Sequence, residues 1–256
     1  MNIVVCIKQV PDTESQIKIG ADGKSIATDD IKWVMNPYDE FGVEEALRIQ
    51  KDKGGTVTVV GAGPKRVTEA LRTALAMGAD KAVLVEDEGL YGADPMAVAK
   101  ILAAAIKPLN PDLVFLGQRA IDDDAGLVGS ALAEHLGLPN LSVVTKVELG
   151  EGSVKVQRPV EGLTLVLEAP LPAVITAQKG LNEPRYASLP GIMKAKKKPL
   201  ETKTLADLGV DKAGKAEIVA LNPPPARAAG KTIGGETPQE LAANLAKALR
   251  EEAKVI

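Results

Sequence analysis

The first half of the chain alternates short apolar runs with longer segments in which apolar residues recur every three or four positions. The apolar runs, rich in Val, Ile and Leu, predict buried strands at residues 2–10, 56–60, 81–85 and 112–116. The periodic segments predict helices at residues 38–51, 94–106 and about 124–136, and one that begins near Val67. This alternation predicts right-handed crossovers and an α/β fold with a doubly wound parallel sheet. Ligands of such sheets bind beyond the carboxyl ends of the strands, so a binding site is expected in the loops that follow these four strands.

From Leu141 onward, apolar and polar residues alternate around glycine-containing turns. Three such runs, residues 142–149, 153–157 and 163–167, predict an antiparallel meander. The apolar run 171–177 then predicts a strand that returns to the main sheet, whereas residues 181–204 have no clear period and contain three prolines. An extended C-terminal arm follows, with Pro223-Pro224-Pro225 and an amphipathic helix. We therefore expect one α/β domain at 1–221 and an arm with a helix at 222–256.

Residues typical of helix starts precede three of the predicted helices. Asp94 followed by Pro95 predicts an N-cap and a first helical position for the segment that ends at Ile106. Asp124 is the expected N-cap of the following helix, and Thr237-Pro238 opens the terminal helix, which we expect to reach about Ala253.

Composition narrows the possible functions. Aromatic residues make up 2% of the 256 residues and the formal net charge is −3, which argues against single-stranded nucleic-acid binding by stacking and against a basic field for phosphate backbones. The single cysteine and single histidine exclude a disulfide within the chain and argue against a zinc site or a Ser-His-Asp triad. No apolar run is long enough to span a bilayer and the first strand begins at Asn2, so we expect a soluble, reducing, intracellular setting without membrane insertion.

Two glycine-containing loops are candidates for a ligand site. Residues 117–129, GQRAIDDDAGLVG, lead from a strand into a helix, where free backbone N–H groups and the helix dipole favour an anion. Its three consecutive aspartates are awkward beside a phosphate, so Asp122 and Asp123 must turn away or contact ribose hydroxyls. The alternative is a plain strand-to-helix turn. The other loop, Gly61-Ala62-Gly63-Pro64, resembles a dinucleotide fingerprint, but Arg66 stands where its third glycine belongs.

Residues 181–203 carry six basic and two acidic residues on an otherwise acidic chain. Leu189, Ile192 and Met193 lie among these charges, and an apolar anchor with steering charge is typical of transient partner docking. The alternative is a solvated lysine run beside a core-packing loop. The isolated residues His135, Cys6 and Trp33 are better explained by surface exposure or packing than by chemistry.

Several long motifs resemble the beta subunit of electron-transfer flavoproteins, in the order and spacing of that family. These motifs are Cys6-Ile7-Lys8, Val34-Met35-Asn36-Pro37, RTALAMGAD at 72–80, AIDDD at 120–124, LPAV at 171–174, NEPRY at 182–186, Leu189-Pro190 and IMKAKKK at 192–198. The resemblance covers essentially the whole chain.

The resemblance implies a fold of the adenine-nucleotide-binding type and a subunit with no catalytic residues of its own. It implies a larger alpha subunit that holds the redox-active FAD, a structural AMP in this subunit, and a C-terminal arm and helix that pack on the alpha subunit. The AMP contacts carried over from the family are Cys6, Asn36, Pro37, Tyr38, Asp39, Ala62, Gly117, Gln118, Arg119, Ala120, Ile121, Asp122, Asp123, Asp124, Ala125, Gly126, Leu127 and Val128.

The resemblance further implies that residues 181–204 include the partner-recognition loop. Its docking residues would be Tyr186, Leu189, Pro190, Ile192, Met193, Lys194 and Lys197, with Leu189 as the anchor. The implied partners are acyl-CoA or other flavin dehydrogenases, as in fatty acid beta-oxidation, and a quinone oxidoreductase. The implied compartment is the cytoplasm of a bacterium, or the mitochondrial matrix in a eukaryote.

Three positions differ from those of some members of the family. Relatives that bifurcate electrons bind a second FAD in this subunit and usually have Thr and Gln where this chain has Ala125 and Leu127. Pro159 stands where some relatives have an acidic residue aimed at the alpha subunit, so that contact is not carried over. The alternatives are a bifurcating-type subunit with its own FAD, a stand-alone adenine-nucleotide-binding protein, and a nucleotide-hydrolysing enzyme.

Overall fold

A computed structural model describes residues 1–227 and 229–256 of the chain. The chain divides into two compact units, Met1–Leu221 and Asn222–Ile256, which are described separately.

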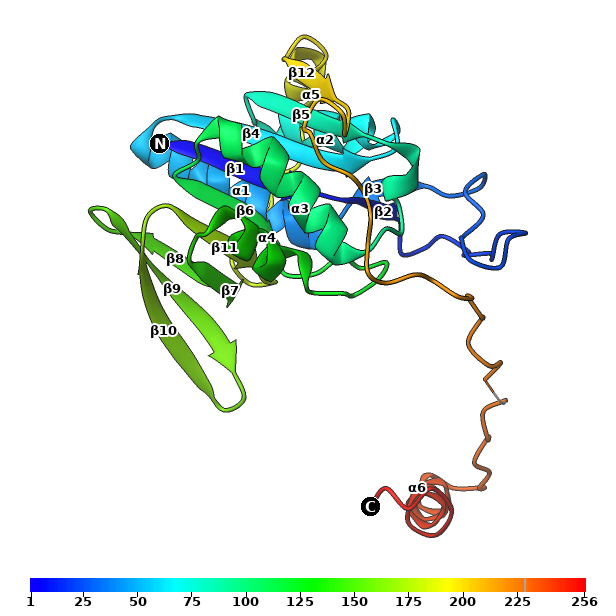
Figure 1. Ribbon diagram of the computed structural model, residues 1–256. Coiled ribbons are helices and arrows are strands. Elements are labelled where there is room, and N and C mark those ends of the chain that lie inside the picture. The colour runs from blue at the N-terminus through cyan, green and yellow to red at the C-terminus, as the bar shows by residue number, and fades with distance from the viewer. Residues whose placement is uncertain (228) are drawn as a thin grey trace. The chain divides into compact units, whose positions relative to one another are not determined.

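A seven-stranded, wholly parallel sheet forms the centre of the first unit (Figure 1). Its strand order is β12-β5-β4-β1-β6-β11-β7. The strands are β1 (Asn2–Ile7), β4 (Thr56–Gly63), β5 (Lys81–Glu86), β6 (Leu113–Gly117), β7 (Asn140–Val144), β11 (Ala173–Ala177) and β12 (Leu200–Lys203). The four predicted strands of the first half are therefore present, and the expected return of residues 171–177 to this sheet is confirmed by β11.

Helices cover both faces of the sheet, as an α/β doubly wound fold requires. Helices α1 (Pro37–Lys53) and α2 (Val67–Met77) pack on one face, and α3 (Pro95–Ile106) and α4 (Val128–Leu136) on the other. Two separate clusters of buried Val, Leu, Ile and Ala side chains fill the layers, which explains the near-continuous apolar sequence of the central strands. The predicted fold class is thereby confirmed. Short 3₁₀ turns, η1 (Glu88–Leu90) and η2 (Lys107–Leu109), flank α3.

The chain changes direction across the sheet at β1. It leaves β1 through α1 to β4 and β5 on one side, and then crosses to β6 on the other side. Neighbouring loops after β1 and β6 therefore diverge to opposite faces, which leaves a crevice at their carboxyl ends.

The expected single strand at residues 2–10 is interrupted at Lys8. β1 ends at Ile7, and β2 (Gln9–Pro11) pairs antiparallel with β3 (Trp33–Met35) in a separate ribbon. The physical reason is that the Lys8 backbone N–H donates to the Asp39 carboxylate at 2.7 Å instead of to a neighbouring strand.

The antiparallel meander is confirmed, with one correction. β8 (Lys146–Leu149), β9 (Ser153–Val160) and β10 (Leu163–Pro170) form a three-stranded antiparallel sheet (Figure 1). Residues 142–144, which were expected to belong to its first strand, lie instead in β7 and pair parallel with β11 in the main sheet.

The segment without a clear period contains two short elements that the sequence did not reveal. Helix α5 (Leu189–Ala195) is capped by Ser188, whose hydroxyl accepts a hydrogen bond from the Gly191 N–H at 3.1 Å. Strand β12 then extends the main sheet beside β5.

The second unit contains α6 (Pro238–Lys247), which continues as a π-helical turn, η3 (Ala248–Ala253). Thr237 caps α6 by accepting from the Glu240 N–H, so the predicted helix start is confirmed. Within the described residues of either unit, no helix combines the length and the apolar character needed to cross a membrane.

Candidate functional site

A cavity opens at the carboxyl ends of β1 and β6, where the sheet topology places the crevice. It is lined by the strand ends of β1, β4 and β6, by the loops after β1, β5 and β6, and by residues of α1, α3 and α4. Much of its wall is apolar, with Cys6 and Leu116 from strand ends, Leu90 from η1, and Val98 and Leu102 from α3. Such a wall suits a flat ring system better than a small ion.

Asp39 lies at the centre of this crevice and bridges the two strands that border it. One of its carboxylate oxygens accepts from the Lys8 N–H and the other from the Gly117 N–H, each at 2.7 Å. Its burial raises the pKa of this carboxyl to about 7, against the opposing effect of these two N–H donors. A side chain at position 117 would place its Cβ 2.5 Å from Asp39 Oδ1, so only glycine fits there.

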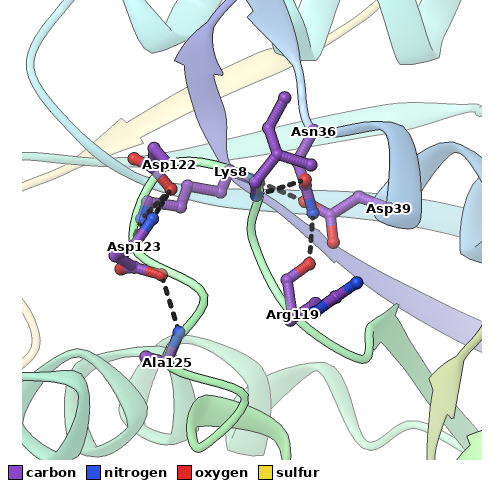
Figure 2. A network of polar contacts seen from close by, with 8 residues as sticks. Lys8, Asn36, Asp39, Arg119, Asp122, Asp123 and Ala125 are labelled. Atoms are coloured by element: carbon purple, nitrogen blue, oxygen red, sulfur yellow. Dashed lines mark hydrogen bonds and ion pairs between the residues drawn. The ribbon is translucent and has the colours of Figure 1, made fainter. Parts of the chain in front are cut away.

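Asn36 joins the loop before α1 to the loop after β6. Its Nδ2 donates to the Arg119 carbonyl at 2.9 Å (Figure 2). Its Oδ1 accepts from the Ile121 N–H at 3.3 Å. The side chain is almost fully buried, so these bonds form with little competition from water. Asn36 therefore fixes the course of the chain around the aspartate run.

Lys8 resolves the electrostatic problem of the three consecutive aspartates. Its Nζ lies 2.8 Å from both Asp122 Oδ1 and Asp123 Oδ2 (Figure 2). The two carboxylates thus turn towards this lysine, and their charge is offset within the protein. An anion can therefore approach the same loop without facing an uncompensated acidic pair.

Asp124 is not the N-cap that the sequence predicted. Its backbone is left-handed, with φ +53°, and its carboxylate pairs with Arg119 at 2.8 Å. The Arg119 guanidinium also donates to the Tyr38 hydroxyl, at 2.9 Å from Nη2, and lies 5.2 Å from the Tyr38 ring centroid. Asp124 is thus paired within the loop, and helix α4 begins after it.

Helix α4 consequently begins without a side-chain cap. Leu127 holds the cap position, and no side chain of the described residues accepts from the first N–H groups of the helix. Uncapped N–H groups and the helix dipole favour an anion, and here they lie at the edge of the cavity. Gly129 lets this end of the helix lie close to β11, since a Cβ there would lie 2.4 Å from Thr176 Cγ2.

A second unused polar group lies in the cavity wall. Gln118 Oε1 is buried and has no hydrogen-bond partner among the described residues. A buried acceptor without a donor is costly, and a ligand hydroxyl or amino group would satisfy it. Together, the apolar wall, the orphan acceptor and the open helix start fit a nucleoside monophosphate: base, ribose hydroxyls and phosphate each find suitable chemistry.

The structure brings most of the expected nucleotide contacts to one cavity. Thirteen of the eighteen expected residues line it: Cys6, Asn36, Asp39, Ala62, Gly117, Gln118, Arg119, Ala120, Asp123, Ala125, Gly126, Leu127 and Val128. The other five, Pro37, Tyr38, Ile121, Asp122 and Asp124, do not line it. Of these, Ile121, Asp122 and Asp124 are bonded to Asn36, Lys8 and Arg119, which holds the lining loop in place. Sequence reasoning missed the segment from Leu90 to Leu102, although the loop after the third strand was among those marked.

The lone tryptophan packs against a cation instead of lining the cavity. Arg66 lies 3.4 Å from the Trp33 ring centroid and 4.8 Å from that of Tyr91, and it donates to Gln9 Oε1 at 2.9 Å. The residue that breaks the dinucleotide pattern thus joins β3 to the loop after β5. Cys6 is buried, and His135 is exposed on α4.

A second candidate site is the surface of α5 and the segment before it. Tyr186 is 99% exposed, Leu189 75% and Met193 60%, and Ile192 lies beside them. Lys194 and Lys197 are also exposed, next to this apolar group. We call Tyr186, Leu189, Ile192, Met193 and the two lysines the α5 patch. Large apolar side chains exposed together in this way are typical of an interaction surface.

The segment that leads into the α5 patch is fastened to α1. Arg185 donates from Nε to Glu44 Oε2 at 2.6 Å and from Nη2 to Glu44 Oε1 at 3.0 Å, a bidentate pair. Glu44 is buried, which by itself raises its pKa, but its bonds to Arg185 and Arg48 outweigh burial and hold the pKa below the ordinary value. Asn182 adds a bond from Nδ2 to the Phe41 carbonyl.

Known proteins are similar to this chain over all or nearly all of its length. Residues 24–208 match the family model described as Electron transfer flavoprotein domain. The chain is 44% identical over 260 residues to the electron transfer flavoprotein subunit beta of Bacillus subtilis (strain 168), with both chains covered completely. It is 41% identical over 257 residues to that of Bradyrhizobium diazoefficiens, again with full coverage, and 41% identical over 248 residues to that of Mus musculus, with 96% of each chain covered. The chain therefore belongs to the electron transfer flavoprotein family, among its beta subunits.

Proposed function

We propose that this chain is the non-enzymatic beta subunit of a heterodimeric electron transfer flavoprotein and binds AMP in the crevice between β1 and β6. The observation that carries the nucleotide proposal is the cavity itself, with its open α4 start and its aspartates paired to Lys8. An FAD held mainly by an alpha subunit supplies the redox chemistry. This chain's residues bind the nucleotide, help to hold the FAD site of the alpha subunit, and dock partner proteins.

The bound nucleotide tests this proposal most directly. The heterodimer, purified without added nucleotide and then denatured, is expected to release one AMP and one FAD per dimer, as measured by chromatography of the supernatant. Two FAD and no AMP would place the protein among bifurcating relatives. Release of FAD alone would contradict an AMP site in this chain.

The α5 patch is the proposed docking surface for flavin dehydrogenases, such as acyl-CoA dehydrogenases, with a quinone oxidoreductase as the electron acceptor. Its support is the combination of exposed apolar side chains with exposed lysines on an otherwise acidic chain. The second unit is proposed to pack on the alpha subunit, because Leu241 and Leu245 of α6 are exposed large apolar residues. We place the protein in the cytoplasm of a bacterium, or in the mitochondrial matrix of a eukaryote.

Neutralising the two patch lysines is expected to slow association with a dehydrogenase. The double variant Lys194→Gln/Lys197→Gln removes two exposed positive charges beside the apolar anchor, so we expect the association rate to fall about three- to tenfold at low salt. The difference should shrink as salt screens the charges. Stopped-flow mixing at a series of salt concentrations measures both effects.

A matched control removes two other exposed lysines. Lys51 and Lys53 lie in the last turn of α1 and are not part of the α5 patch. Lys51→Gln/Lys53→Gln changes the net charge by the same amount and is expected to leave the association rate near that of the unmodified protein. If both double variants slow association equally, the effect belongs to net charge and not to the patch.

A further inference from the structure

Helix α5 is too short to be stable alone. It has seven residues, whereas isolated helices in water need about 12–15 even with favourable sequences. The orientation of the α5 patch must therefore be set by the elements on which α5 packs.

The inner side of α5 lies directly on the backbone of α2. A Cβ at Gly191 would lie 2.4 Å from the Ala76 carbonyl oxygen, and Ala195, one turn later, is 3% exposed. Ala195 is the buried residue of α5, whereas Leu189 and Met193 are 75% and 60% exposed and Ile192 is 44% exposed. Such a close contact fixes distance well but supplies little apolar burial.

Two basic side chains complete the contact between α2 and α5. Each of them hydrogen-bonds to backbone carbonyls at the C-terminal end of the other helix. Lys198 Nζ donates to the carbonyl oxygens of Leu75, Gly78 and Ala79, at 3.1, 3.1 and 2.6 Å. These carbonyls end α2, which has no basic residue of its own in its last turn. In return, Arg72 of α2 donates from Nη1 to the carbonyl oxygens of Ala195 and Lys198, at 2.6 and 2.9 Å, just where α5 ends.

This exchange separates Lys198 from the lysines that precede it. Lys194, Lys196 and Lys197 are exposed, whereas Lys198 is half-buried and its Nζ is occupied by three carbonyls. Burial lowers the pKa of Lys198, which agrees with an ammonium drawn away from water. In sequence the four lysines look equivalent, but their surroundings are not.

We propose that Lys198 is a positioning residue for partner docking: with Arg72 it sets the orientation of α5 on α2, and hence the direction in which Leu189 and Met193 face a partner. It is not a steering charge. This inference rests on the proposed docking function of the α5 patch. It explains how the patch is held in its binding orientation before a partner arrives.

The test uses the intact heterodimer as electron acceptor for an acyl-CoA dehydrogenase supplied with its acyl-CoA, and follows the flavin absorbance. Lys198→Met is expected to raise the KM for the flavoprotein by about tenfold and to leave kcat near the unmodified value, because the complex forms less readily but transfers electrons normally. The dependence of KM on salt should be unchanged. Lys198→Arg, which retains donors for the same carbonyls, should recover most of the loss.

The matched control is the neighbouring lysine. Lys197→Met removes the same charge from the same turn and is expected to weaken the salt dependence of KM, because its Nζ faces solvent. Arg72→Gln removes the reciprocal cap and should reproduce the Lys198→Met result, so the proposal remains testable should one variant fold poorly. A KM for Lys198→Met equal to that of the unmodified protein, or a salt dependence flattened as in Lys197→Met, would overturn the positioning role. If the unmodified heterodimer accepts no electrons from the dehydrogenase, the proposed docking function itself is wrong.

Discussion

Replacing Leu189 by alanine is expected to raise the KM of the heterodimer as electron acceptor for a flavin dehydrogenase by roughly 30-fold. Leu189 is 75% exposed in the free protein, so its truncation removes little from the fold. In a complex, an apolar side chain that fills a partner pocket commonly contributes about 2 kcal/mol, which corresponds to that factor. Steady-state reduction of the flavoprotein by the dehydrogenase measures the change.

The same variant should retain its FAD content and its heterodimer stability, since Leu189 lies on the outer side of α5. Met96→Ala is a suitable control, because Met96 is 43% exposed on α3, which packs on the opposite face of the main sheet from α2. Equal losses of electron transfer, FAD content and dimer stability in Leu189→Ala would contradict the docking assignment.

Asp39→Asn is expected to remove a large part of the pH dependence of stability between pH 4 and 7. In the folded protein the pKa of Asp39 is raised from 3.8 to about 7, chiefly by burial. The folded state therefore binds more protons than the unfolded state within this window. The contribution of Asp39 to the free energy of unfolding is fully present below pH 4 and falls as the pH rises towards 7. Above pH 7 it no longer changes. A shift of this size corresponds to roughly 4 kcal/mol.

Urea unfolding of the full-length chain at several pH values checks this expectation, with the slope of stability against pH as the measured quantity. Absolute stability is less informative, because an asparagine amide also replaces one of the two acceptors used by the Lys8 and Gly117 N–H groups. His135→Gln serves as the control, since His135 is exposed and does not line the crevice. Identical slopes for Asp39→Asn and the unmodified protein would show that Asp39 is ionised throughout.

The strength of each local signal explains how much of the fold the sequence predicted. Helix α3 was found with its Asp94 cap, and helix α2 begins at Val67, where its apolar period predicted a helix start. Helix α5 was missed because its inward positions are Gly191 and Ala195, which produce no apolar period. Strand β12 is a four-residue edge strand whose sequence, LETK, carries no buried run.

The candidate site was predictable in outline for a different reason. Ligands bind beyond the carboxyl ends of parallel strands, so the loops after all four predicted strands could be marked. The observed strand order then places the crevice after β1 and β6. The roles of individual aspartates could not be predicted. They depend on Lys8, which reaches Asp122 and Asp123 from the end of β1, and on Arg119, which pairs with Asp124 within the same loop. The part of the cavity wall that Leu90 and Leu102 contribute was not predicted, because an apolar sequence does not distinguish side chains that face a ligand from those that face the core.

The reciprocal capping of α2 and α5 has a consequence for protein engineering. The C-terminal end of α5 is capped by Arg72 of α2, and Lys198, just after α5, caps α2. Helix α5 is therefore not a unit that can be transferred on its own. To transplant partner choice from one flavoprotein to another, the last two turns of α2 would have to travel with α5, and position 191 would have to remain glycine. The unit of exchange is the helix pair and not the loop.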